Sequence, residues 1–187
     1  MKSNKNLIWL DCEMSGLDMV NDVILEVACV ITDQQLQVIA EQPSIVIHQP
    51  ESVLEAMGPW CQNQHKKSGL IEDVRTSTTT LEEAQDTVLE FLGRYCFPST
   101  SPLCGSSVWV DRVFLMNYLP KINDFCHYRN VDIAAIKELV SRWYSFNLKA
   151  ELPKREQHRA LPDIYESIAE LNFYRERFFV TPEPSNT

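Results

Sequence analysis

The sequence lacks any long hydrophobic run. No apolar stretch among its 187 residues approaches the roughly 20 residues that a membrane-spanning helix needs. Only four apolar residues, 7–10, precede the first acidic residue, Asp11, and these are too few for the core of a signal peptide. We therefore expect no membrane partner and a cytoplasmic location.

Paired cysteine motifs are also missing. The six cysteines are scattered with no C-x-x-C pair, so the sequence contains neither a zinc-ribbon motif nor a dithiol redox motif. We interpret them as small buried hydrophobic residues. A chain of this length buries roughly 70% of the surface that its unfolded form exposes, so it needs no disulfide or structural metal to fold.

Positive charge is scarce. The chain has 17 Lys and Arg against 26 Asp and Glu, a net charge of −9, and its isoelectric point is near 4.9. A protein that grips a long nucleic acid presents a basic surface, so we expect no long nucleic-acid track here. A short anionic ligand, held by a few local cations or by metal ions, is compatible with this charge.

The overall composition is that of an ordinary globular protein, with 44% apolar and 23% charged residues. The length fits one domain, which we place at 1–180. The last residues, 181–187, include two prolines and are expected to form a frayed tail.

The hydrophobic pattern predicts an α/β fold. Three β-branched and apolar runs near the N-terminus predict strands, and the short turn at 33–35 makes these first three strands antiparallel. Helical spacing and prolines then predict helices that alternate with two further strands. The predicted strands are 7–13, 23–32, 37–48, 102–106 and 128–131, and the predicted helices are 81–97, 111–119, 132–143 and 162–177. This order implies a mixed central sheet flanked by α-helices.

Two carboxylates end the first predicted strand. Asp11 and Glu13 are two residues apart, so they share one face of the strand and lie about 7 Å apart. Unpaired anions at a buried strand repel each other and resist desolvation, so something must compensate them. A Lys or Arg partner, exposure at the strand end, or a divalent cation would each do so, and the pair alone favours the first two.

Three further residues change that balance. Asp111 and Asp163 stand at predicted helix starts, where either acid could simply complement the helix dipole. His158 lies in a polar loop five residues before Asp163, and a helix-terminal role for the acids does not explain it. Carboxylate oxygens without a thiolate motif favour Mg²⁺ or Mn²⁺ over zinc. Two such ions together with a His of pKa about 6.5 are typical of a phosphodiesterase site.

Three ordered motifs, at 7–17, 104–115 and 158–164, resemble those of the DEDDh 3′–5′ exonuclease family. The third motif has the form in which His precedes Asp by five positions. The resemblance covers nearly the whole chain and is closest to the bacterial oligoribonucleases, also through residues 127–129 and 137–139.

This resemblance implies a ribonuclease-H-like fold and a homodimer that removes 5′-mononucleotides from the 3′ ends of very short RNA oligonucleotides, down to the dinucleotide. His158 would be the general base. Two Mg²⁺ or Mn²⁺ ions per active site would be held by Asp11, Glu13, Asp111 and Asp163, with Asp11 bridging them.

The resemblance also implies substrate-binding residues, each with an ordinary alternative. Leu17 matches an apolar wedge between two bases, or it closes the core. His65, Ser107 and Arg129 match residues that cap a 5′ phosphate, or they are a surface His, a helix N-cap and a surface ion pair. Tyr128 matches an aromatic that the partner subunit places over the site, or it packs in the core.

Two positions depart from the family pattern. Ala134 stands where the family usually has Ser, which removes one phosphate hydrogen bond. Residues 108–110 are bulkier than the family pattern, and we expect Trp109 to lie in the core rather than to form a stacking surface.

The sequence leaves two other functions open. One is a DEDDh exonuclease for single-stranded DNA or tRNA 3′ ends. The other is a non-catalytic nucleotide-binding protein of the same fold, which the presence of all four acids and the His disfavours.

Overall fold

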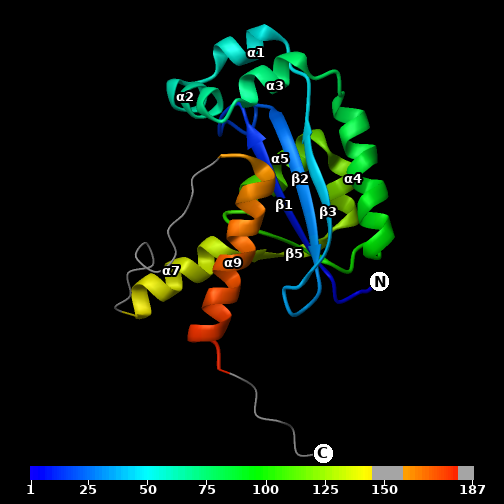
Figure 1. Cartoon of the computed structure of the whole chain (residues 1–187), viewed down its shortest axis with the longest axis vertical. Helices are drawn as coiled ribbons and strands as arrows, with labels where there is room; N and C mark the ends of the chain where they lie inside the picture. The colour runs from blue at the N-terminus through cyan, green and yellow to red at the C-terminus, as the bar shows by residue number, and fades with distance from the viewer. Residues whose placement is uncertain (145–157, 181–187) are drawn as a thin grey trace, which may run out of the picture.

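A five-stranded mixed sheet forms the centre of the protein (Figure 1). The computed structural model describes residues 1–144 and 158–180, so the predicted tail at 181–187 lies outside the described residues. The strands follow the spatial order β3-β2-β1-β4-β5. They are β1 Leu7–Met14, β2 Ile24–Thr32, β3 Val38–Val46, β4 Pro102–Gly105 and β5 His127–Asp132. Strands β1 to β3 are antiparallel, β4 runs parallel to β1, and β5 runs parallel to β4. This confirms the predicted mixed sheet with three antiparallel strands at its start.

The helices lie on both faces of this sheet and beyond one end of it (Figure 1). Their bounds are α1 Glu51–Ala56, α2 Pro59–Lys67, α3 Leu70–Thr76, α4 Leu81–Tyr95, α5 Trp109–Tyr118, α6 Pro120–Phe125, α7 Ile133–Trp143 and α9 Ala160–Phe178. None of these described helices combines the length and the apolar character that crossing a membrane requires.

Four of the described helices were not predicted from the sequence pattern, and these are the short ones, α1, α2, α3 and α6. Each has 6 to 9 residues, which is too short for a helical period to recur clearly. The last helix also begins two residues earlier than predicted, at Ala160. Pro162 is still in its first turn, where the missing N–H costs no intrahelical hydrogen bond.

Alternation along β1 decides which side chains face which helices. Ile8 and Leu10 pack into the core beneath α4 and α5, whereas Trp9 packs into the second core, beneath α7 and α9. Successive side chains of a strand point to opposite faces. Asp11 and Glu13 therefore lie on the α9 side of the sheet, as Trp9 does.

The cysteines behave as the sequence predicts. All six are free thiols, and five of them are buried while Cys61 is partly buried. They contribute to the core as small apolar side chains.

We expect Leu10→Ala to lower the free energy of unfolding by about 2 to 5 kcal/mol, because Leu10 is fully buried in the sheet and its loss leaves a cavity. Urea denaturation followed by circular dichroism measures this. Val20→Ala is the control, since Val20 is 82% exposed. Equal midpoints for the two variants would contradict this packing.

Candidate active site

The site lies at the carboxyl end of β1. This strand pairs with the parallel strand β4 through Ile8 and Trp9, and β4 ends at Gly105. A Cβ at Gly105 would stand 3.2 Å from the carbonyl oxygen of Leu10, so glycine allows the chain to turn away close to β1. Beyond that point β1 continues without β4 beside it. Crevices outside the carboxyl ends of strands are where α/β sheets bind ligands.

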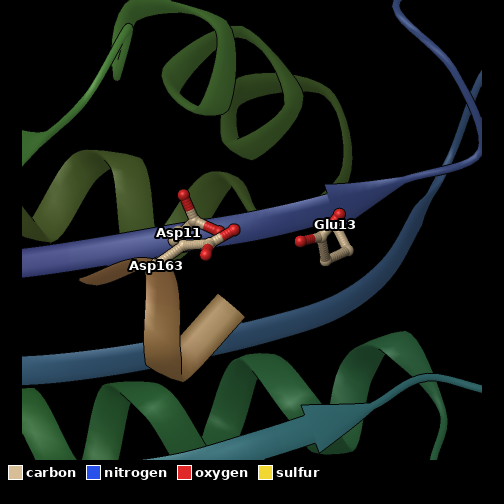
Figure 2. Close-up of side chains that lie close together, drawn as sticks. All are labelled: Asp11, Glu13 and Asp163. Atoms are coloured by element: carbon tan, nitrogen blue, oxygen red, sulfur yellow. The ribbon is translucent and has the colours of Figure 1, made fainter. Parts of the chain in front are cut away.

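Three carboxylates from two elements meet in this place. Asp11 and Glu13 come from β1, and Asp163 comes from the first turn of α9. One oxygen atom from each side chain lies within 4.8 Å of the others. Figure 2 shows the carboxylates of Asp11 and Asp163 next to each other, with Glu13 further along β1. The predicted convergence of residues more than 140 positions apart in the sequence is therefore present.

Asp111 stands beside this group rather than within it. It lies in the first turn of α5, is 6% exposed, and accepts a hydrogen bond of 2.9 Å from the backbone N–H of Cys12. That N–H lies past the last pair of β1 with β4, so the side chain satisfies a strand donor that β4 leaves open. Of the neighbouring charges, that of Asp111 contributes most to raising the pKa of Asp11.

Burial and mutual repulsion raise the pKa values of these acids. Burial raises the pKa of Asp11 well above its usual range, and the charges of Asp111, Glu13 and Asp163 add to this effect. Burial and then the charge of Asp163 raise the pKa of Glu13 to about 8. Burial raises the pKa of Asp111 to about 7. Clustered carboxylates with this property fit a hard divalent cation, whose charge would remove the repulsion.

His158 stands just before the N-terminus of α9 and has a positive φ of 49°. Its ring meets the edge of the Trp60 ring at 5.6 Å between centroids. Trp60 is 63% exposed and therefore offers an open aromatic face beside His158. The sequence analysis missed Trp60, because an exposed aromatic cannot be told from a core aromatic before the fold is known.

His65 is part of the same site. It is 2% exposed, and its Nε2 lies 2.9 Å from the carbonyl oxygen of Met14. Its Nδ1 lies 4.0 Å from Oε2 of Glu13 and has no hydrogen-bond partner among the described residues. The alternative of a surface His is therefore wrong.

The alternatives for Ser107 and Leu17 are also wrong. The N-cap residue of α5 is Val108, with no side-chain cap, while Ser107 has a φ of 55° and donates its backbone N–H to Asp132. Leu17 is 73% exposed and so does not close the core. Its loop is built tightly, since a Cβ at Gly16 would stand 2.2 Å from the Asp22 carboxylate.

Strand β5 carries Tyr128 and Arg129 at the edge of the sheet, two strand positions from β1. Tyr128 is 75% exposed, so core packing is wrong. The Arg129 guanidinium lies over the Tyr128 ring, and its Nε donates to the tyrosine hydroxyl at 3.1 Å. Arg129 thus contacts an aromatic residue in place of the surface ion pair considered above.

Trp109 is not in the core, which corrects the expectation from the sequence. It is 54% exposed, while its neighbour Val108 is fully buried. The helix α5 begins at Trp109, earlier than predicted, and this turns the indole outward while Asp111 turns inward.

Comparison with known proteins identifies the family. The model of the Exonuclease (RNase_T) family matches residues 8–171. The oligoribonuclease of Ralstonia nicotianae is 48% identical over 177 residues, which are 95% of this chain and 80% of that protein. The oligoribonuclease of Marinobacter nauticus is 48% identical over 179 residues, which are 96% of this chain and 99% of that protein. This chain belongs to the oligoribonuclease family of exonucleases.

Solved exonuclease structures share the fold of this oligoribonuclease-family chain. Escherichia coli Exonuclease I in complex with a dT13 oligonucleotide superposes with a TM-score of 0.72 at 15% identity, over 92% of this chain. Exonuclease I from Methylocaldum szegediense superposes with a TM-score of 0.69 at 19% identity, also over 92% of this chain. The chain spans 41% of the length of each of these proteins. At such identity the likeness concerns the fold alone, and it confirms the predicted fold class.

We expect Mn²⁺ to raise the melting temperature, and to raise it more at pH 8 than at pH 6. A carboxyl group must lose its proton to bind a metal. Because the pKa of Glu13 is about 8, this side chain is still protonated at pH 6, and the metal must displace the proton there. Without metal the folded state keeps this proton above pH 4.5, where the unfolded state has lost it. Protonated Glu13 therefore makes its full contribution to the free energy of unfolding below pH 4.5, and this contribution is lost as the pH rises to about 8.

Thermal unfolding with millimolar Mn²⁺ or with a chelator, at both pH values, measures this dependence. Asp86→Asn, on an exposed face of α4, is the control and should respond as the parent does. An Asp163→Asn variant that keeps the full Mn²⁺ response would show that the metal binds elsewhere.

Proposed function

We propose that this protein is a 3′–5′ exoribonuclease that degrades very short RNA oligonucleotides to 5′-mononucleotides. The observation that carries the proposal is the convergence of Asp11, Glu13 and Asp163, with Asp111 beside them, in a chain of the oligoribonuclease family. The reaction breaks the last phosphodiester bond by attack of water on its phosphorus. It leaves a 3′ hydroxyl on the shortened RNA.

In this proposal Asp11, Glu13, Asp111 and Asp163 would hold two Mg²⁺ or Mn²⁺ ions. The ions supply positive charge for the attacked phosphate and for the leaving oxygen. The carboxylates would fix the position of that charge. His158 accepts the proton of the attacking water, a task that imidazole side chains commonly perform in hydrolytic enzymes.

The remaining residues select the substrate. Leu17, exposed in the loop after β1, inserts between two bases. His65, Ser107 and Arg129 bind the 5′ phosphate of a dinucleotide. Ala134 offers no hydroxyl there, so the phosphate has fewer donors. A net charge of −9 agrees with substrates of a few nucleotides, because no basic surface is required to hold a long backbone.

We also propose that the active unit is a homodimer in which Tyr128 covers the site of the partner subunit. Two observations support it: Tyr128 is exposed on an edge strand, and it lies two strand positions from the carboxylates of its own chain. A groove of about 430 Å³ lined by Arg112, Met116 and His127, among others, adjoins Tyr128 and gives a second copy a surface to pack against.

We expect the parent protein with Mg²⁺ to convert a labelled RNA pentamer and dimer to mononucleotides, and a chelator to stop the reaction. His158→Ala should lower kcat about 100- to 10,000-fold with little change in RNA binding, because only proton transfer is lost. Chromatography of the products measures turnover, and Asp86→Asn should match the parent. Equal rates on the RNA dimer and on a long DNA strand would favour a DNA exonuclease instead.

The homodimer can be tested by complementation. His158→Ala and Tyr128→Ala should each be weakly active, and mixing them under exchanging conditions should restore activity. A mixed dimer has one site with both an intact His158 and an intact partner Tyr128. Mixed activity no higher than the mean of the two variants would contradict a Tyr128 that acts across subunits.

A further inference from the structure

A buried ion pair lies on the strand next to the carboxylates. Glu26 on β2 is fully buried and stands opposite Glu13 in the register of β1 and β2. The guanidinium of Arg159 binds it in a bidentate manner, with Nη2 at 2.9 Å from Oε1 and Nε at 3.2 Å from Oε2. A fully buried carboxylate needs such a partner, because leaving it unpaired is strongly destabilising.

The same guanidinium joins further elements at the start of α9. Its Nη1 donates to Oδ2 of Asp73 on α3 at 2.8 Å and to the carbonyl oxygen of Ser68 at 3.4 Å. Oε2 of Glu26 also accepts the backbone N–H of Ala160 at 3.1 Å. Backbone and side chain of this segment are therefore held on β2 at the same carboxylate.

His158 is the residue covalently attached to this anchored point. Arg159 is the N-cap of α9, and its carbonyl oxygen accepts the N–H of Asp163. The positive φ of His158, 49°, is uncommon for a residue with a side chain and persists where surrounding contacts impose it. The contacts of Arg159 and Ala160 with Glu26 act on the peptide that follows His158.

Stability alone does not explain the choice of residues. A buried ion pair replaced by well-packed apolar side chains often leaves a protein equally stable or more so. What apolar side chains would not supply is direction, since the planar guanidinium fits a carboxylate in one orientation. We therefore attribute the ion pair to a need for a fixed backbone orientation at the start of α9.

We propose that Glu26 and Arg159 are positioning residues whose ion pair sets the orientation of His158 at the start of α9. This inference rests on the proposed function, in which His158 is the general base. The pair touches neither the substrate nor the reacting atoms, and it acts through the backbone that joins Arg159 to His158.

Arg159→Lys tests the orientation, because it keeps the charge and removes the bidentate geometry. We expect kcat on a diribonucleotide to fall roughly 10- to 100-fold, the usual cost of a small misplacement of a catalytic group, with KM and the Mn²⁺ concentration for half-maximal rate unchanged. Glu26→Gln should change kcat in the same direction. Arg75→Lys is the matched control, since Arg75 binds Glu51 in the same bidentate manner on the surface, and it should leave kcat unchanged.

A double-mutant cycle separates positioning from general damage. In a His158→Ala background, Arg159→Lys should lower kcat by less than about twofold, because the group that it positions is already gone. A full 10- to 100-fold loss in that background would overturn the inference. The inference would also be overturned if, in a parent protein whose activity depends on His158, Arg159→Lys had the same kcat as Arg75→Lys.

Failure of the proposed function can be distinguished from failure of the positioning inference. If the parent does not cleave RNA, or if His158→Ala cleaves as fast as the parent, the proposed function fails. If both hold and Arg159→Lys is unfolded at the assay temperature, Asp73→Asn decides, because Asp73 is a half-exposed partner of the same guanidinium. If Asp73→Asn lowers kcat in the parent but has no effect on kcat in the His158→Ala background, the result supports positioning. If Asp73→Asn leaves kcat of the parent unchanged, the result overturns it.

Discussion

Electrostatic repulsion among carboxylates at the end of β1 is the constraint on which the rest of this structure depends. Asp11, Glu13, Asp111 and Asp163 come from β1, α5 and α9, and the fold brings them to one place despite their like charge. The raised pKa values of Asp11, Glu13 and Asp111 express the cost of that arrangement. A divalent cation reverses the sign of the local field and converts the same geometry from unfavourable to favourable. The arrangement of these carboxylates therefore suits a divalent cation at this point.

The surrounding residues limit this cost without removing it. Asp111 accepts a backbone N–H that β4 leaves open, and this bond lowers the pKa of Asp111 against the effect of burial. The charge of Arg159 lowers the pKa of Glu13, but the guanidinium forms most of its hydrogen bonds with Glu26 and Asp73. The positive charge of Arg159 thus holds the framework together and does not neutralise the carboxylates of the pocket.

Much of the site could be predicted from the sequence because the relevant signals are local. The spacing of Asp11 and Glu13 on one strand puts both on one face, and the turn at 33–35 makes the first strands antiparallel. Helices of 10 residues or more repeat their period often enough to be recognised, as α4, α7 and α9 were. The helices α1, α2 and α3 were not predicted because each is too short to repeat its period. They nevertheless form a small core of their own around Leu25 and Leu70.

By itself the sequence determined the residue types of the site, the order of its motifs and the faces on which the first acids lie, because strand and helix periods are properties of neighbouring residues. Only the tertiary structure decided that His65 is buried against Glu13, that Trp60, Trp109 and Tyr128 are exposed, and that Glu26 holds Arg159. Exposure and long-range pairing depend on which elements pack together. A residue such as Glu26 finds its partner 133 positions away, and no local pattern encodes that distance.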